Sequence, residues 1–167
     1  GQKVPRWPEC HIPDWVEEKS EHERYRLLLS YLTELVTRYR DSEAIVRWQV
    51  ENEPFFPFGE CPEVNTDYLL QEIKTVRALD NRPIQMTVSG ELEPWLGSAG
   101  QADVLGVSLY RVTWNDFYGY FIYPFTPAFY SLRAWGAEFF VESVIISELQ
   151  AEPWFFEGID TRSPEEW

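Results

Sequence analysis

The sequence predicts an α/β protein built on a parallel sheet. Segments with the apolar patterns of strands alternate with segments that carry the periodic apolar stripes of helices, in the order β-α-β-α-β-α-β. Such alternation favours parallel strands joined by helical crossovers. No Gly-rich phosphate loop of either nucleotide-binding type occurs in the sequence, so the commonest signature of an open, doubly wound sheet is missing. A length of 167 residues is typical of one domain.

The first long element is an amphipathic helix that begins after Ser20. Ser20 and Glu23 have the spacing of a capping box, in which each side chain accepts a hydrogen bond from the other residue's backbone. Asp41 and Ser42 end this helix. Its apolar stripe follows i, i+3, i+4 spacing and consists of Tyr25, Leu28, Leu29, Leu32, Leu35, Val36 and Tyr39.

A short apolar strand over 44–50 follows, and Glu51-Asn52-Glu53-Pro54 comes directly after it. A loop over 55–65, rich in aromatic residues, Pro and Gly, leads to a second helix capped by Asn65 or Thr66. The elements after this helix are strands at 83–88, 103–110 and 143–147, a short helix at 94–102, a long aromatic and polar loop at 111–127, and a helix at 127–140. Residues 4–7 have the pattern of the end of one more strand.

Two closures of this sheet are consistent with the pattern: an open doubly wound sheet or part of a (β/α)8 barrel. The missing phosphate loops favour the barrel. Because a complete barrel takes about 250 residues, we expect 1–167 to be a single fragment of a (β/α)-barrel catalytic domain, a partial TIM barrel from the end of strand 3 to just past strand 7. Ser163-Pro164-Glu165-Glu166 has the pattern of a helix start one residue before Trp167, which also predicts a fragment.

Composition excludes several classes of partner. Fourteen Lys and Arg against 28 Asp and Glu give a net charge of −14, which disfavours nucleic acid and anionic membrane surfaces. No run approaches the roughly 20 apolar residues of a membrane span, so we expect no membrane contact from this segment. Aromatic residues make up 17% of the chain and include eight Trp, which indicates either an aromatic core or a surface that stacks flat ligands such as sugar rings.

The few cysteines and histidines predict no metal site, and no motif for another cofactor occurs. Cys10 and Cys61, with His11 and His22, have no metal-binding spacing. The two cysteines form one disulfide if the chain lies outside the cytoplasm, or they are two free thiols. The sequence does not fix the location, and an extracytoplasmic or secreted one is favoured.

Two glutamates follow predicted strands. Glu53 comes after the strand at 44–50 and Glu148 after the strand at 143–147, about three βα units further on at roughly 30 residues per unit. In a barrel, residues at the carboxyl ends of strands face the active site. Retaining glycosidases need two carboxyl groups about 5–5.5 Å apart. The alternative for each glutamate is a solvated residue at a strand end.

The neighbours of these glutamates resemble clan A glycoside hydrolases. Residues 50–54 (Val-Glu-Asn-Glu-Pro) resemble the Asn-Glu-Pro signature that ends strand 4 in that clan, and residues 146–150 (Ile-Ser-Glu-Leu-Gln) resemble its strand 7 nucleophile segment. Residues 107–110 (Val-Ser-Leu-Tyr) look like the end of strand 6. The opening residues 5–11 (Pro-Arg-Trp-Pro-Glu-Cys-His) are similar to a strand 3 end in bacterial proteins like the family 5 cellulases.

The resemblance implies a retaining hydrolase of a β-linked poly- or oligosaccharide. Glu53 would be the general acid/base and Glu148 the nucleophile. Asn52 would hydrogen-bond the sugar 2-hydroxyl, and Tyr110 would hydrogen-bond Glu148 and hold it ionised. Glu51 is a competing carboxylate, because strand alternation places it on the same face as Glu53.

Three tryptophans fall in loops at the expected mouth of the barrel: Trp7, Trp114 and Trp154. Each is either a platform for sugar stacking or a packing residue, whereas Trp48 lies mid-strand and is expected in the core. Strands 1, 2 and 8 of the clan, and the Arg common at its strand 2 end, have no counterpart here. The chain would therefore lack part of its own active site.

Two other functions remain open. A non-catalytic carbohydrate-binding or scaffold protein would keep the barrel but would need neither Glu53 nor Glu148. A barrel enzyme of the aldolase type would place a Schiff-base lysine at a strand end, but the chain's lysines fall at the N-terminus, in a loop and in a helix: Lys3, Lys19 and Lys74.

Overall fold

The computed structural model describes residues 14–56, 64–115, 117 and 119–150. The chain forms two compact units, with the boundary between Gln85 and Met86. The sequence expectations for residues 4–7, Trp7, Cys10 with Cys61, and Trp154 lie outside the described residues.

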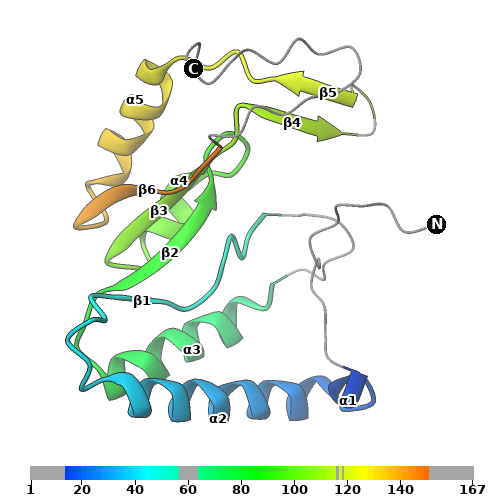
Figure 1. Ribbon diagram of the computed structural model, residues 1–167, viewed down its shortest axis with the longest axis vertical. Helices are drawn as coiled ribbons and strands as arrows, with labels where there is room; N and C mark the ends of the chain where they lie inside the picture. Colours follow the sequence, from blue (N-terminus) through cyan, green and yellow to red (C-terminus); the bar gives the residue numbers. More distant parts are fainter. Residues whose placement is uncertain (1–13, 57–63, 116, 118, 151–167) are drawn as a thin grey trace. The chain divides into compact units, whose positions relative to one another are not determined.

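The main sheet has four strands in the order β1-β2-β3-β6 (Figure 1). These are β1 (Trp48–Gln49), β2 (Ile84–Ser89), β3 (Val104–Leu109) and β6 (Ser143–Leu149). β1 pairs in parallel with β2, and β3 pairs in parallel with β6. The predicted α/β class is confirmed, and parallel strands that neighbour one another in chain order match a partial (β/α)8 barrel.

The first unit is built around α1 (Asp14–Glu17), α2 (Glu21–Tyr39) and α3 (Thr66–Leu79). The predicted capping box is present: the Ser20 hydroxyl accepts from the Glu23 N–H, and the Glu23 carboxylate accepts from the Ser20 N–H. α3 begins at the Asn65 cap, whose Oδ1 accepts from two backbone N–H groups. The Tyr25 and Tyr68 rings stack at 3.8 Å, and the Tyr25 hydroxyl donates to the Tyr68 carbonyl at 2.6 Å, which fixes α2 against α3.

The strand expected over 44–50 is much shorter than predicted. It pairs only at Trp48 with Ile84 and at Gln49 with Gln85. Val46, which an apolar strand would bury, is 67% exposed, because β2 is the only strand beside it in the described part of the chain. Trp48 is half-buried rather than in the core, and its indole N–H donates to the Asp80 carboxylate at 3.0 Å.

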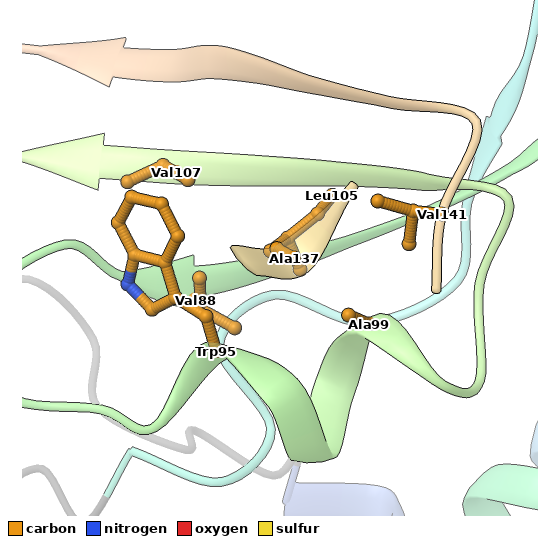
Figure 2. Packing of buried hydrophobic residues seen from close by; sticks show 7 residues of the cluster. All are labelled: Val88, Trp95, Ala99, Leu105, Val107, Ala137 and Val141. Atoms are coloured by element: carbon orange, nitrogen blue, oxygen red, sulfur yellow. The ribbon is translucent and has the colours of Figure 1, made fainter. Parts of the chain in front are cut away.

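The second unit has an apolar core between its strands and helices. Val88, Leu105 and Val107 from β2 and β3 pack against residues of α4 (Trp95–Ala99) and of α5 (Pro127–Ala137) with the segment that follows it. The seven clustered side chains are shown in Figure 2: Val88, Trp95, Ala99, Leu105, Val107, Ala137 and Val141. β2 is buried along its whole length, as expected of an inner strand of a parallel sheet, whereas β6 is only partly covered, with Ile146 and Leu149 exposed.

The register between β3 and β6 shifts between Val107 and Ser108. Val107 lies opposite Ile146, but Ser108 lies opposite Glu148, so Ser147 is the extra residue of a bulge. β6 also continues to Leu149, two residues beyond the predicted end, which places Glu148 inside the strand rather than after it. Bulges redirect the side chains beside them, so this irregularity affects how Glu148 is presented.

The segment predicted as a loop at 111–127 contains an antiparallel hairpin instead. β4 (Val112–Asn115) pairs with β5 (Gly119–Ile122), with Val112 opposite Ile122. β-branched and aromatic residues dominate both strands, and that composition favours strands. Trp114 therefore lies in a strand, with its backbone opposite Tyr120. Among the helices that the structure describes, none has both the length and the apolarity needed to cross a bilayer.

Candidate active site

Asn52 and Glu53 lie in a bend just beyond β1, in the first unit. A chain of side-chain amides leads to them: Gln85 donates to Gln49 at 2.9 Å, and Gln49 donates to the Asn52 Oδ1 at 3.0 Å. The Asn52 side chain is therefore tied to the sheet, although the residue itself is exposed.

Glu53 has a left-handed backbone with a φ of 45°. Such a conformation is uncommon for residues other than Gly and is enriched at functional sites. The side chain of Glu53 is half-buried. The strained backbone at this residue agrees with a functional role for the bend that follows β1.

Glu51 does not share a face with Glu53 through strand alternation, and that expectation is wrong because the strand ends at Gln49. Instead Glu51 is hydrogen-bonded to Glu72 of α3. Burial, followed by the negative charge of Glu51 and the hydrogen bond to it, raises the pKa of Glu72 to about 8. Burial also raises the pKa of Glu51, against the hydrogen bonds that it accepts from Glu72 and from the Asn52 N–H. At neutral pH Glu72 is therefore protonated, and its carboxyl O–H donates a hydrogen bond to the Glu51 carboxylate.

One carboxyl oxygen of the Glu51–Glu72 pair is buried without a hydrogen bond. Glu72 is 4% exposed, and its Oε2 is buried without a hydrogen-bond partner. A shallow cavity of about 250 Å³ opens beside the pair, with Tyr25 and Tyr68 in its wall. Burial and the nearby negative charge of Glu72 raise the pKa of Tyr25 to about 12. Glu72 was missed by sequence reasoning, although a Glu three residues after Leu69 and four before Val76 on an apolar helix face was a readable signal.

In the second unit, Glu148 of β6 and Tyr110 after β3 are in contact. The Tyr110 hydroxyl donates to the Glu148 Oε2 at 2.6 Å. This is the hydrogen bond that the resemblance implied for these two residues. The Glu148 side chain is half-buried, and Tyr110 is 38% exposed, so the pair lies at the surface of the unit.

Gln150 holds the chain on the far side of Tyr110. Its backbone N–H donates to the Leu109 carbonyl at 3.0 Å. Its side-chain amide clamps Val112 at both ends, accepting from the backbone N–H at 2.8 Å and donating to the carbonyl at 3.1 Å. Leu109, directly before Tyr110, and Val112, two residues after it, are thus both bonded to Gln150, which directly follows β6.

Two further carboxyl groups, which sequence reasoning did not identify, follow β2. Glu91 accepts from the Tyr130 hydroxyl at 2.8 Å and from the Tyr110 N–H. Glu93 accepts from the Ser89 N–H at 3.0 Å and from the Ser98 hydroxyl at 3.4 Å. Burial raises the pKa of Glu91, and the hydrogen bonds that it accepts and the charge of Arg133 oppose that rise.

Arg133 of α5 closes the loop that carries these carboxyl groups. Its guanidinium donates to the carbonyls of Gly90 at 2.6 Å and Glu91 at 3.3 Å, and also to the carbonyl of Glu93. The same group lies over the Trp95 ring at 4.5 Å, a cation–π contact. Gly90 admits no side chain, since a Cβ there would lie 2.5 Å from the Ser108 carbonyl oxygen.

Several aromatic side chains between β5 and α5 pack on one another. The Phe125 ring stacks on Phe129 at 4.2 Å and on Tyr123 at 5.6 Å, and Tyr123 meets Phe121 edge to face at 4.9 Å. Mutual packing therefore accounts for part of the high aromatic content.

The predicted site residues are thus distributed over both units. Asn52 and Glu53 lie in the first, and Tyr110 with Glu148 in the second. Trp114 lies in β4, and Trp7 and Trp154 lie outside the described residues. The separation of the Glu53 and Glu148 carboxyl groups stays a prediction. Within the described ranges, no three His, Cys, Asp or Glu side chains gather to hold a metal ion.

Comparison with known proteins finds a similarity at the level of structure alone. No model of a known protein family matches the chain, and no curated protein is significantly similar in sequence. Among solved structures, a β-glucuronidase from Ruminococcus gnavus in complex with D-glucuronic acid is similar to it, with a TM-score of 0.43 and 15% identity. The match covers 54% of this chain and 15% of that one. A likeness of this size carries no argument about function, and the assignment to family 5 has no support from the comparisons.

Proposed function

We propose that the protein containing this chain is a retaining glycoside hydrolase that cleaves β-linked glycans, with Glu53 as general acid/base and Glu148 as nucleophile. The observation that carries the proposal is the Tyr110–Glu148 hydrogen bond at the carboxyl end of neighbouring parallel strands. A phenol beside a carboxylate at this edge of the sheet is an arrangement suited to an oriented nucleophile.

The reaction runs in two displacements. Glu148 attacks the anomeric carbon while Glu53 gives its proton to the leaving oxygen, so that a glycosyl ester forms and the glycosidic bond breaks. Glu53, now a carboxylate, then takes a proton from a water molecule that attacks the ester and frees Glu148. Asn52, bonded through Gln49 to the sheet, supports the sugar 2-hydroxyl in this scheme.

The substrate is a poly- or oligosaccharide. Trp7, Trp114 and Trp154 are proposed as stacking platforms, because aromatic faces bind the flat apolar faces of sugar rings. A cellulase-like preference for β-glucans belongs to the same proposal and rests on the resemblance of residues 5–11 alone.

The roles of Glu148 and Glu53 are distinguished by how strongly the activity loss of each Gln variant depends on the leaving group of the substrate. Glu148→Gln should lower kcat by about 10³-fold or more on every substrate, because no ester forms. Glu53→Gln should lower kcat/KM by about 10²–10⁴-fold on β-glucan or mannan but little on aryl β-glycosides with weakly basic leaving groups, whose departure needs no acid. On the aryl substrates kcat should still fall, because hydrolysis of the ester needs Glu53 as the base.

The matched control is Glu142→Gln, the same chemical change at an exposed residue just before β6. It should leave both rates unchanged. Full activity in both Glu148→Gln and Glu53→Gln, or binding of glycans without any turnover by the wild-type protein, would overturn the proposal, the second result in favour of a carbohydrate-binding protein.

A further inference from the structure

Tyr110 is held from both ends by carboxyl groups. Its backbone N–H donates to Glu91, and its hydroxyl donates to Glu148 at 2.6 Å. The backbone bond fixes the position of the Tyr110 main chain just after β3, and the side-chain bond fixes the position of its hydroxyl group. Glu91 and Glu148 are therefore joined through one residue without being partners of each other.

Glu91 is itself firmly placed. It is 8% exposed, its Oε1 accepts from the Tyr130 hydroxyl at 2.8 Å, and its own carbonyl accepts from Arg133 at 3.3 Å. Tyr130 and Arg133 both come from α5. The Arg133 bond fixes the Glu91 backbone and the Tyr130 bond fixes its carboxyl group, so the carboxyl is a well-placed acceptor for the Tyr110 N–H.

Glu93 provides an internal comparison two residues along the same loop. It is 3% exposed, and its carboxyl group accepts from the Ser89 N–H and the Ser98 hydroxyl. Both glutamates stabilise the loop, but the bond to Tyr110 comes from Glu91.

We propose that Glu91 is a positioning residue for Glu148, acting through the backbone of Tyr110. The inference rests on the proposed role of Glu148 as nucleophile. Without the Glu91 acceptor, the Tyr110 backbone is still held through the bonds of Gln150 to Leu109 and Val112, but the phenol orients the Glu148 carboxylate less well. Displacement of a reacting group by about 1 Å can cost about 10²-fold in rate.

The kinetic test compares Glu91→Ala with Glu93→Ala. Glu91→Ala should lower kcat by about 10–10²-fold with little change in KM, and Glu91→Gln, which keeps one acceptor oxygen, should restore most of the loss. Glu93→Ala should lower thermal stability to a similar extent but keep kcat per folded molecule. In a Tyr110→Phe background, Glu91→Ala should add almost nothing, because the two changes break one chain of contacts.

A second measurement does not depend on turnover. In protein labelled with 3-fluorotyrosine, the ¹⁹F resonance of Tyr110, assigned from Tyr110→Phe, should move in Glu91→Ala and stay in place in Glu93→Ala. Should Glu91→Ala fail to fold, Tyr130→Phe removes only the hydroxyl that holds Glu91 and should give a smaller shift in the same direction.

The two readouts separate the two proposals. A shifted Tyr110 resonance in a protein that hydrolyses no glycoside would support the positioning contact and reject the proposed function. An unshifted resonance, equal kcat losses in Glu91→Ala and Glu93→Ala, or additive losses with Tyr110→Phe would overturn the role of Glu91.

Discussion

Buried carboxyl groups have different hydrogen-bond partners in the two units. In the first unit, Glu51 and Glu72 face each other, share a proton, and leave one oxygen of Glu72 without a partner. In the second unit, Glu91 and Glu93 each accept hydrogen bonds from hydroxyl and N–H donors, and Arg133 binds the carbonyls of the same loop. Burial raises the pKa of both Glu72 and Glu91. The charge of Glu51 and the hydrogen bond to it raise the pKa of Glu72 further, whereas the hydrogen bonds that Glu91 accepts and the charge of Arg133 lower the pKa of Glu91.

This difference affects the candidate site residues in each unit. The proton shared by Glu51 and Glu72 lies directly before Asn52 and Glu53, so the bend after β1 is sensitive to pH. In the second unit the Tyr110 N–H donates to Glu91, which also accepts from the Tyr130 hydroxyl, whose pKa burial raises. We therefore expect the first unit to respond to pH and the second to respond to the loss of individual donors.

The largest effect should come from Arg133→Met, which removes the guanidinium group that donates to three carbonyls of the second unit. Three carbonyls lose their partner, and the cation–π contact with Trp95 is lost. We expect the free energy of unfolding to fall by about 3 kcal/mol, since hydrogen bonds from charged groups contribute about 1.5–3 kcal/mol each and are not additive. Urea unfolding measures this.

The control for that change is Arg133→Lys, which keeps the charge without the planar set of donors. It should recover less than half of the lost stability. If Arg133→Met unfolds at the same urea concentration as the wild type, the network does not hold the loop.

The next effect is pH-dependent and belongs to the first unit. Because the pKa of Glu72 is raised from 4.5 to about 8 in the folded chain, the folded state binds this proton more tightly than the unfolded state does. The stabilisation is fully present below about pH 4.5 and is lost as pH rises through about 8. Glu72→Gln, a permanent mimic of the acid, should therefore be more stable than the wild type at pH 9, by about 1–3 kcal/mol.

Urea unfolding at pH 5, 7 and 9 tests this expectation. Glu34→Gln, the same change at an exposed position of α2, should follow the wild-type curve at all three values. A Glu72→Gln variant whose stability keeps the wild-type pH dependence would show that Glu72 does not hold the proton.

The smallest effect should come from Ser98→Ala. The Ser98 hydroxyl donates to the Glu93 carboxyl group at the long distance of 3.4 Å. We expect a loss of about 0.5–1 kcal/mol, with no change in the pH dependence of unfolding. A loss above about 2 kcal/mol in the same urea experiment would mean that single donors matter more here than their geometry suggests.

Local patterns predicted most of the fold. The capping box at Ser20, the cap at Asn65 and the apolar run of β3 lie where the sequence placed them, because caps and periodicity depend on residues close in the chain. The length of β1, the hairpin in 111–127 and the bulge at Ser147 depend on partner strands, and a single sequence does not specify them.

The site was predicted in the same uneven way. Tyr110 and Glu148 were matched through motifs, and their hydrogen bond is present. The contacts Glu51–Glu72 and Glu91–Tyr130 join residues that are 21 and 39 positions apart in the chain. A pattern of neighbouring residues therefore does not predict them. A Glu on the buried face of α3 was the one readable sign.

The central claim is that Glu148 is the nucleophile of a retaining glycosidase. Its most direct test is incubation with a 2-deoxy-2-fluoro-β-glycosyl fluoride of the sugar that the protein hydrolyses, followed by digestion and mass spectrometry. We expect one covalently bound sugar on Glu148, no label in Glu148→Gln, and a first product with the β configuration. A label on another residue, or a product of inverted configuration, would contradict it.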